Sequence, residues 1–249
     1  MKISVKTPKE IKIMSEGGKR LHEVKEKLRE EVHEGVSAWR IEETADRLIK
    51  KTGGSPSFKM VPKYFWATCI NINEGVVHGI PTTEMVFKKG DIVSVDVGLY
   101  YKGFHTDTSF SVGIGLDNEE KVFLKAGEEA FSNALVATKQ GNRVYDVSNA
   151  IESTLDNYKF TPVRALVGHG VGRELHEEPP IPGFVSGSYN DSPEIPVGAV
   201  FAIEVIYAKG SPNIVISNDG WTISTADGKI SALFEDSVAV TKKGPILLT

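Results

Sequence analysis

The sequence contains a single cysteine, Cys69, and no long apolar run. One thiol cannot form an intramolecular disulfide, so cysteine usage gives no support for secretion. No stretch approaches the roughly 20 apolar residues that a membrane-spanning helix needs. The N-terminal residues also lack the apolar run of a signal peptide. We therefore expect a cytoplasmic protein that does not enter a membrane.

An excess of positive charge is also absent. The chain has 29 Lys and Arg against 33 Asp and Glu, a formal net charge of −4. A nucleic-acid-binding protein usually carries a basic stripe and a high isoelectric point. The basic residues of the first fifty positions alternate with Glu, which is typical of solvated helix faces. We therefore expect no nucleic-acid partner.

The length of 249 residues suits one large domain, with 40% hydrophobic and 25% charged residues. A chain of this length can bury a full core without disulfides or a structural metal. We predict a single catalytic domain over residues 1–249. Any metal that the sequence implies should serve chemistry and not folding.

Helical spacing of apolar residues predicts two helices between Thr7 and Thr52, with Thr7 and Ser37 as candidate caps. Strands are predicted over residues 91–101 and 104–114, joined by a turn at Tyr101-Lys102-Gly103. Two more helices are expected over residues 118–139 and 144–158. The last ninety residues are strand-like, with many Gly and Pro turns.

The chain repeats itself, because residues 90–97 align with residues 198–205. Both segments begin at Gly, alternate apolar residues and place a carboxylate at the same offset, Asp96 in one and Glu204 in the other. The two halves, about 1–115 and 116–249, then each contain two helices and an antiparallel strand pair. Chance similarity between two apolar strands is the alternative. A pseudo-twofold repeat predicts an α+β fold, with a central curved antiparallel sheet and helices on its outer face.

Four carboxylates lie in strand-like segments where ions are costly: Asp96, Asp107, Glu204 and Glu235. A buried ionised carboxylate must be paired or bound to metal. The alternative for each is an edge strand with its polar face in water. Clustered carboxylates repel one another, and no Lys or Arg stands near them in these strands. Divalent metal ions are the natural counter-charge.

A histidine among glycines, His169 in Gly168-His169-Gly170-Val171-Gly172, narrows the choice of metal. Glycine lets the backbone approach closely. Four carboxylates and one imidazole, without a thiolate, do not suit a closed structural zinc site. They suit two divalent ions such as Co, Mn, Fe or Zn that share carboxylates and activate a bridging water.

Two further histidines, His78 and His176, stand near turns. An imidazole beside an activated water is suited to proton transfer or to hydrogen bonding a carbonyl oxygen. Ordinary surface histidines are the alternative. The remaining three look unremarkable, although His105 stands close to Asp107: His22, His33 and His105.

The ordered set of four acids and one histidine resembles the methionine aminopeptidases, in particular their short type I form. The resemblance covers nearly the whole chain and rests on residues 69–74, 77–81, 94–97, 105–109, 168–179, 202–204 and 234–235. It implies the pita-bread fold, which agrees with the pseudo-twofold repeat. It also implies removal of the initiator methionine from nascent proteins when the second residue is small.

The resemblance assigns the metal ligands residue by residue. It implies that Asp96 and Asp107 bind metal, with Asp107 and Glu235 bridging the two ions. It implies that His169 and Glu204 complete the shell of one ion. Hydrolysis is then expected from a hydroxide activated by the dinuclear metal centre.

The resemblance also implies roles in catalysis and substrate binding. Glu204 is expected to relay the proton, while His78 and His176 contact the substrate and steady the scissile carbonyl. The side-chain pocket is expected to include Tyr64, Cys69, Leu175 and Trp221.

The chain departs from the family pattern at Val61, Glu174, Leu175 and Val205. Val61 and Leu175 stand where aromatic residues are usual, Glu174 where a small residue is usual, and Val205 where proline is usual. Metal binding should be little affected, because no ligand changes. The pocket should stay apolar but change in shape.

The expected partners are the N-termini of nascent polypeptides, with the ribosome as the place of encounter and a monomer as the acting form. Two alternatives stay open. One is a prolidase or creatinase relative of the same fold, although those proteins usually carry a large N-terminal domain. The other is a non-catalytic binding module, although such modules typically lose metal ligands.

Overall fold

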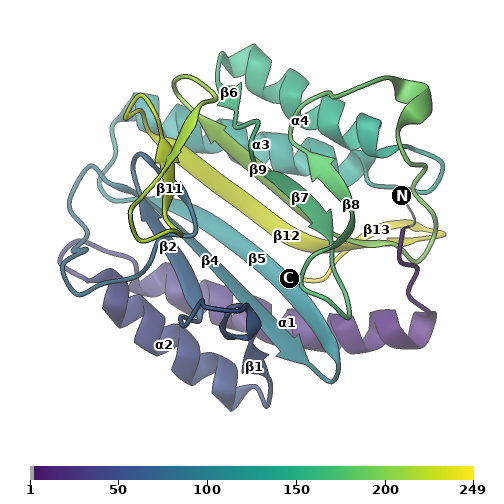
Figure 1. Ribbon diagram of the computed structural model, residues 1–249, viewed down its shortest axis with the longest axis horizontal. Helices are drawn as coiled ribbons and strands as arrows, with labels where there is room; N and C mark the ends of the chain where they lie inside the picture. Colours follow the sequence, from purple (N-terminus) through teal and green to yellow (C-terminus); the bar gives the residue numbers. More distant parts are fainter. Residues whose placement is uncertain (1–2) are drawn as a thin grey trace.

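A ten-stranded antiparallel sheet forms the centre of the computed structural model, which describes residues 3–249 (Figure 1). The first two residues, which the predicted domain includes, lie outside the described part. The helices are α1 Pro8–Glu31, α2 Ala38–Lys51, α3 Asn118–Ala137 and α4 Val144–Tyr158. The four longest strands are β4 Ile92–Tyr101, β5 Phe104–Gly113, β9 Val200–Ala208 and β12 Ser231–Thr241.

Shorter strands extend this sheet and build a second one. The flanking strands are β1 Ser55–Pro56, β2 Thr68–Ile72, β6 Thr161–Pro162, β7 Val167–Gly170, β8 Glu177–Pro182 and β13 Gly244–Leu247. The separate three-stranded sheet consists of β3 Gly75–Val77, β10 Ile214–Ile216 and β11 Ile223–Thr225. The sequence predicted strands in these regions but not that three of them would leave the main sheet.

The predicted helix starts are confirmed by their caps. The Thr7 hydroxyl accepts from the Glu10 amide, and the Glu10 carboxylate accepts from the Thr7 amide, which forms a capping box before α1. Ser37 accepts from the Arg40 amide at the start of α2. These side chains bond backbone amides that the first turn leaves without helical partners, and so they set where each helix begins.

The order of the main strands supports the predicted pseudo-twofold repeat. In the sheet, β4, β5, β12 and β9 are neighbours in that order, so the two halves meet between β5 and β12. On the outside, β2 pairs with β4 and β7 pairs with β9. The starts of α2 and α4 make equivalent isolated bridges, Ser37 to Val86 and Arg143 to Glu194. The two halves therefore repeat one arrangement of helices and strands.

Each half has its own core between its helices and one face of the sheet. Val95 and Val97 of β4 pack with residues of α1 and α2, and Ile203 and Val205 of β9 pack with residues of α3 and α4. Side chains alternate along a strand. The residues between these valines and isoleucines, Asp96 and Glu204 among them, therefore point to the opposite face, away from the helices.

No helix among residues 3–249 is long and apolar enough to cross a membrane.

Candidate metal centre

A single row of side chains crosses the sheet on the face that the helices leave open. Cys69 of β2 is in register with Asp96 of β4, and Asp96 with Ser109 of β5. Ser109 is in register with Glu235 of β12, and Glu235 with Glu204 of β9. Residues in register on neighbouring strands point to the same face. The sheet itself therefore brings three of the predicted acids together.

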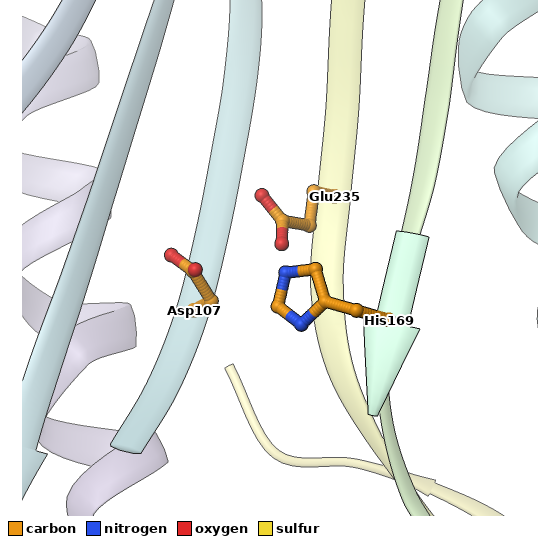
Figure 2. A group of neighbouring side chains, drawn as sticks. All are labelled: Asp107, His169 and Glu235. Atoms are coloured by element: carbon orange, nitrogen blue, oxygen red, sulfur yellow. The ribbon is translucent and has the colours of Figure 1, made fainter. Parts of the chain in front are cut away.

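The other two predicted ligands, Asp107 and His169, lie two residues along the strands from this row. Asp107 is two residues from Ser109 on β5, and His169 of β7 is in register with Ala202, two residues from Glu204. A step of two residues keeps the same face of the sheet. Ligand atoms of Asp107, His169 and Glu235 all lie within 4.8 Å of one another, and Figure 2 shows the three side chains converging from separate strands.

The imidazole of His169 is held so that one nitrogen faces the acids. Its Nδ1 lies 2.8 Å from the carbonyl oxygen of Gly170, which can only accept a hydrogen bond, so Nδ1 carries the proton. Its Nε2 lies 3.3 Å from Glu204 Oε1. Burial lowers the pKa of His169 to about 4, which keeps the ring neutral. A neutral imidazole with a fixed tautomer is suited to bind metal through Nε2.

The four acids lie where water cannot stabilise their charge. Burial, reinforced by the neighbouring acids, raises the pKa of Asp96 and of Glu235 well above its usual range. Burial and nearby Asp107 do the same to Glu204. Burial raises the pKa of Asp107 to about 8. Within residues 3–249, no Lys or Arg forms a salt bridge with any of these four acids.

Several buried oxygens at this site lack the hydrogen-bond partners that buried polar atoms normally have. Asp96 Oδ1, Glu235 Oε1 and Ser109 Oγ are buried and have no hydrogen-bond partner among the described residues. An unsatisfied buried polar atom costs about 1–3 kcal/mol, and more when it is charged. Divalent cations would provide both the missing partners and the missing positive charge. The donor set therefore fits the predicted divalent metal ions.

His78 and His176 both lie beside this centre. The rings of His176 and His169 are edge-to-face with centroids 4.5 Å apart. His176 is at the solvent-exposed edge of the cavity, and His78 is half-buried next to Trp221. Burial lowers the pKa of both rings, with nearby His176 adding to the effect on His78. A lowered pKa favours the neutral form of each imidazole.

A cavity of about 310 Å³ opens beside the five predicted ligands. The predicted pocket residues all line it: Tyr64, Cys69, Leu175 and Trp221. Sequence reasoning missed other lining residues, including Phe58, Leu166, Ile206 and Leu233. These residues come from a short 3-10 helix, a loop and two strands, and no local motif marks them. The cavity wall next to the acids is thus mainly apolar and aromatic.

The structure corrects the expectation for His105 and adds Ser109 to the site. His105 was expected to be unremarkable, but this expectation was wrong, because its ring is buried and its Nδ1 lies 2.9 Å from Ser57 Oγ. Burial lowers its pKa to about 4. Ser109 was missed entirely. The spacing Asp107-Thr108-Ser109 was the available signal, because a strand places the first and third residues on one face.

The metallopeptidase family M24 model matches residues 12–242. This chain belongs to that family. The M24 chain is 38% identical to methionine aminopeptidase 1 of Bacillus subtilis over 248 residues, which is 99% of each protein. It is also 38% identical to methionine aminopeptidase of Clostridium perfringens over 99% of this chain and 98% of that protein.

The solved structures that resemble the M24 chain have the pita-bread fold, as predicted. Methionine aminopeptidase from Thermotoga maritima superimposes with a TM-score of 0.96 at 38% identity, covering 100% of this chain and 99% of that one. The prolidase from Pyrococcus furiosus gives a TM-score of 0.78 at 23% identity, covering 98% of this chain and 65% of that one. The second likeness concerns the fold alone.

The four departures from the family pattern lie in different surroundings in this M24 chain. Leu175 and Val61 belong to the apolar cluster at the cavity, with Phe58 and Tyr64. Glu174 is exposed. Val205 is fully buried in the core between β9 and the helices, on the face of β9 opposite the acids. Only Val61 and Leu175 are therefore placed to shape the pocket.

Proposed function

We propose that this chain is a methionine aminopeptidase that removes the initiator methionine from nascent proteins when the second residue is small. The observation that carries the proposal is the set of five donor side chains beside an apolar cavity. The full-length similarity of this chain to proteins named methionine aminopeptidase supports the same activity.

The cavity is proposed to receive the methionine side chain. An unbranched thioether is flexible and packs well against aromatic rings, and Tyr64 and Trp221 lie edge-to-face with ring centroids 5.0 Å apart. Cys69 and Leu175 supply further apolar surface. Charged side chains lose their hydration in such a pocket, which disfavours an acidic or basic first residue.

The proposed ligands are Asp96, Asp107, His169, Glu204 and Glu235. Two bound divalent ions would supply Lewis acidity and a water of lowered pKa, with Co, Mn, Fe and Zn all compatible with these donors. Glu204 is proposed to accept a proton from the attacking water and to return it to the leaving nitrogen. Glu204 Oε1 lies 3.3 Å from His169 Nε2, which supports its inclusion in the proposed donor set.

His78 and His176 are proposed to bind the substrate. As neutral imidazoles, each can donate one hydrogen bond to the scissile carbonyl oxygen. Donors that are already aimed at this oxygen stabilise the negative charge that develops on it during attack. The backbone of His78 adopts a positive φ of 57°, which is uncommon for a residue other than glycine.

The cellular setting is part of the proposal. Residues 1–249 are proposed to act as a single catalytic domain and as a monomer in the cytoplasm. The proposed partners are the N-termini of nascent chains, encountered at the ribosome. Sedimentation of the purified protein with and without ribosomes tests this setting, and it is wrong if the protein is dimeric or never sediments with them.

Peptide cleavage by the metal-loaded protein tests the activity. We expect release of methionine from Met-Ala-Ser in the presence of Co, Mn, Fe or Zn, and little hydrolysis of an X-Pro dipeptide. Preference for the X-Pro dipeptide would favour the prolidase alternative. A folded protein that contains no metal under replete conditions would favour a non-catalytic module.

A further inference from the structure

Lys6 is a buried lysine that the proposed chemistry does not use. Its side chain is 1% exposed, and its Nζ lies 2.5 Å from Glu177 Oε2. Desolvation lowers the pKa of Lys6, while the hydrogen bond to Glu177 opposes this effect. Lysine is almost never buried to this degree without a partner. Burial of this ion pair therefore carries a desolvation cost that the proposed chemistry does not account for.

The backbone of Lys6 is fixed independently of this ion pair. The Lys6 amide donates to the carbonyl oxygen of Gly198 at 2.7 Å, and Val5 forms a β-bridge with Ala199. Thr7 then caps α1. Lys6 is thus held between the start of α1 and the segment that leads into β9.

The second carboxylate oxygen of Glu177 accepts hydrogen bonds within the turn formed by residues 173–177. Its Oε1 accepts from the Arg173 amide at 2.8 Å and from the Glu174 amide at 3.4 Å. The turn also leaves room for the lysine, because a Cβ on Gly172 would lie 2.3 Å from Lys6 Cε. One carboxylate therefore joins the 173–177 turn to the N-terminal segment, which lies 171 residues away in sequence.

His176 directly precedes Glu177 in this turn, and its ring packs against His169. We propose that Lys6 is a positioning residue, which acts through Glu177 to hold the His176 imidazole at the metal centre. This inference rests on the proposed function of His176. Without the ammonium group, Glu177 Oε2 loses its cationic partner, while Oε1 still accepts from the turn amides, so the turn is expected to shift until water reaches Oε2. A displacement of about 1 Å at a reacting group can cost about 100-fold in rate.

The test compares Lys6→Met in the wild-type background and in the His176→Ala background. In the wild-type background we expect kcat for Met-Ala-Ser to fall about 10- to 100-fold per metal-loaded site. In the His176→Ala background we expect a further change below about 2-fold, because the residue on which Lys6 acts is gone. Metal affinity, measured by calorimetry, should stay the same. Lys9→Met, at an exposed lysine nearby, should behave as wild type.

A purely structural ion pair gives a different result. It would lower the melting temperature and leave kcat per folded, loaded site unchanged, or it would reduce kcat equally in both backgrounds. Either result overturns the proposal. If Lys6→Met does not fold, Glu177→Gln provides the same comparison, because the neutral amide can still accept from the Arg173 amide but no longer pairs with Lys6.

A second measurement separates this inference from the proposed function. If the loaded wild-type protein releases no methionine, the proposed function fails. The ring resonances of the histidines still report on position in that case. We expect Lys6→Met to shift the His176 resonance and to leave those of the exposed His22 and His33 in place. An unmoved His176 resonance overturns the positioning role.

Discussion

Asp107 and Glu235 are buried carboxylates, and no Lys or Arg of residues 3–249 forms a salt bridge with either of them. Such groups weaken the metal-free protein, since their charge has neither water nor an ion pair to stabilise it. At the residue scale, the acids that suit the site to metal binding therefore lower the free energy of unfolding of the metal-free protein. The same property makes the contribution of each ligand measurable.

Asp107→Asn should change metal binding and stability in opposite directions. The amide keeps the size of the side chain but removes its charge, so metal affinity should fall at least about 100-fold. The metal-free variant should be more stable than metal-free wild type by about 1–3 kcal/mol, because the Asp107 carboxyl, whose pKa burial raises to about 8, no longer has to take up a proton or desolvate a charge when the chain folds. Calorimetric metal titration and denaturant unfolding measure the two effects. Asp156→Asn, at an exposed site, is the control, and a less stable metal-free Asp107→Asn would contradict the argument.

His78→Asn should reduce catalysis without emptying the metal centre. Asparagine tolerates the positive φ of 57° at this position, so the backbone can stay in place. We expect kcat to fall about 100- to 1,000-fold, as for the loss of one donor to a developing oxyanion. Metal content by elemental analysis should match wild type. Unchanged kcat would remove His78 from the proposed mechanism.

At the scale of elements, α2 holds one wall of the pocket through a buried carboxylate. Glu42 Oε2 accepts from the Thr68 amide at 3.0 Å and from the Thr68 hydroxyl at 2.8 Å, and Oε1 accepts from the Ala67 amide at 2.8 Å. The Tyr64 hydroxyl donates to the Thr68 carbonyl oxygen at 2.9 Å. A helix thereby fixes the loop that carries the pocket aromatic residue.

Glu42→Gln should loosen this wall. The amide nitrogen cannot accept a hydrogen bond, so one oxygen's partners lose their acceptor, at a cost of about 1–3 kcal/mol. We expect a higher KM for Met-Ala-Ser and a smaller change in kcat, with metal affinity unchanged. Glu43→Gln, on the exposed side of the same helix, should leave KM unaltered. Equal KM values for the two variants would contradict the role of Glu42.

The contact between β7 and β9 depends on a glycine beside His169, the proposed histidine ligand. A Cβ on Gly168 would lie 2.6 Å from the Ala202 carbonyl oxygen and 3.1 Å from the Glu204 amide nitrogen. Gly168→Ala should therefore push β7 away from β9 and destabilise the protein by about 1–3 kcal/mol. It should also weaken metal binding, since His169 moves with β7. Gly183→Ala, where the nearest atom is 3.6 Å away, is the control for thermal melting and metal titration.

At the scale of the whole molecule, the two halves meet at the candidate metal centre. Asp96 and Asp107 come from the first half, and His169, Glu204 and Glu235 come from the second. An ion bound between them links both halves of the sheet. Metal binding should therefore stabilise the entire fold and not only the loops around the site.

Removal of metal should lower the melting temperature in one cooperative transition. A ligand at 100 times its dissociation constant stabilises the folded state by about 2.7 kcal/mol, provided that it does not bind the unfolded chain. We expect calorimetry of chelator-treated protein to show a single peak at lower temperature, restored by added Mn or Co. Two separate peaks would mean that the halves unfold independently.

The sequence by itself determined the long helices, the two main strand pairs and their repetition. These features depend on local caps, on apolar periodicity and on turn residues, all of which are readable along the chain. The acids in apolar strands were visible for the same reason, because a carboxylate at the wrong position in an alternating pattern stands out. The resemblance to a known family then named roles for them, which stay predictions.

The tertiary structure alone decided which side chains meet. Strand register aligned Asp96 with Ser109 and Ser109 with Glu235, and no local pattern encodes register between distant strands. Packing of the chain also buried His105, which the sequence presented as ordinary, and brought Lys6 to Glu177. Burial and pairing belong to the packed chain. For this protein, the sequence supplied the donors, and packing placed them within reach of a common ion.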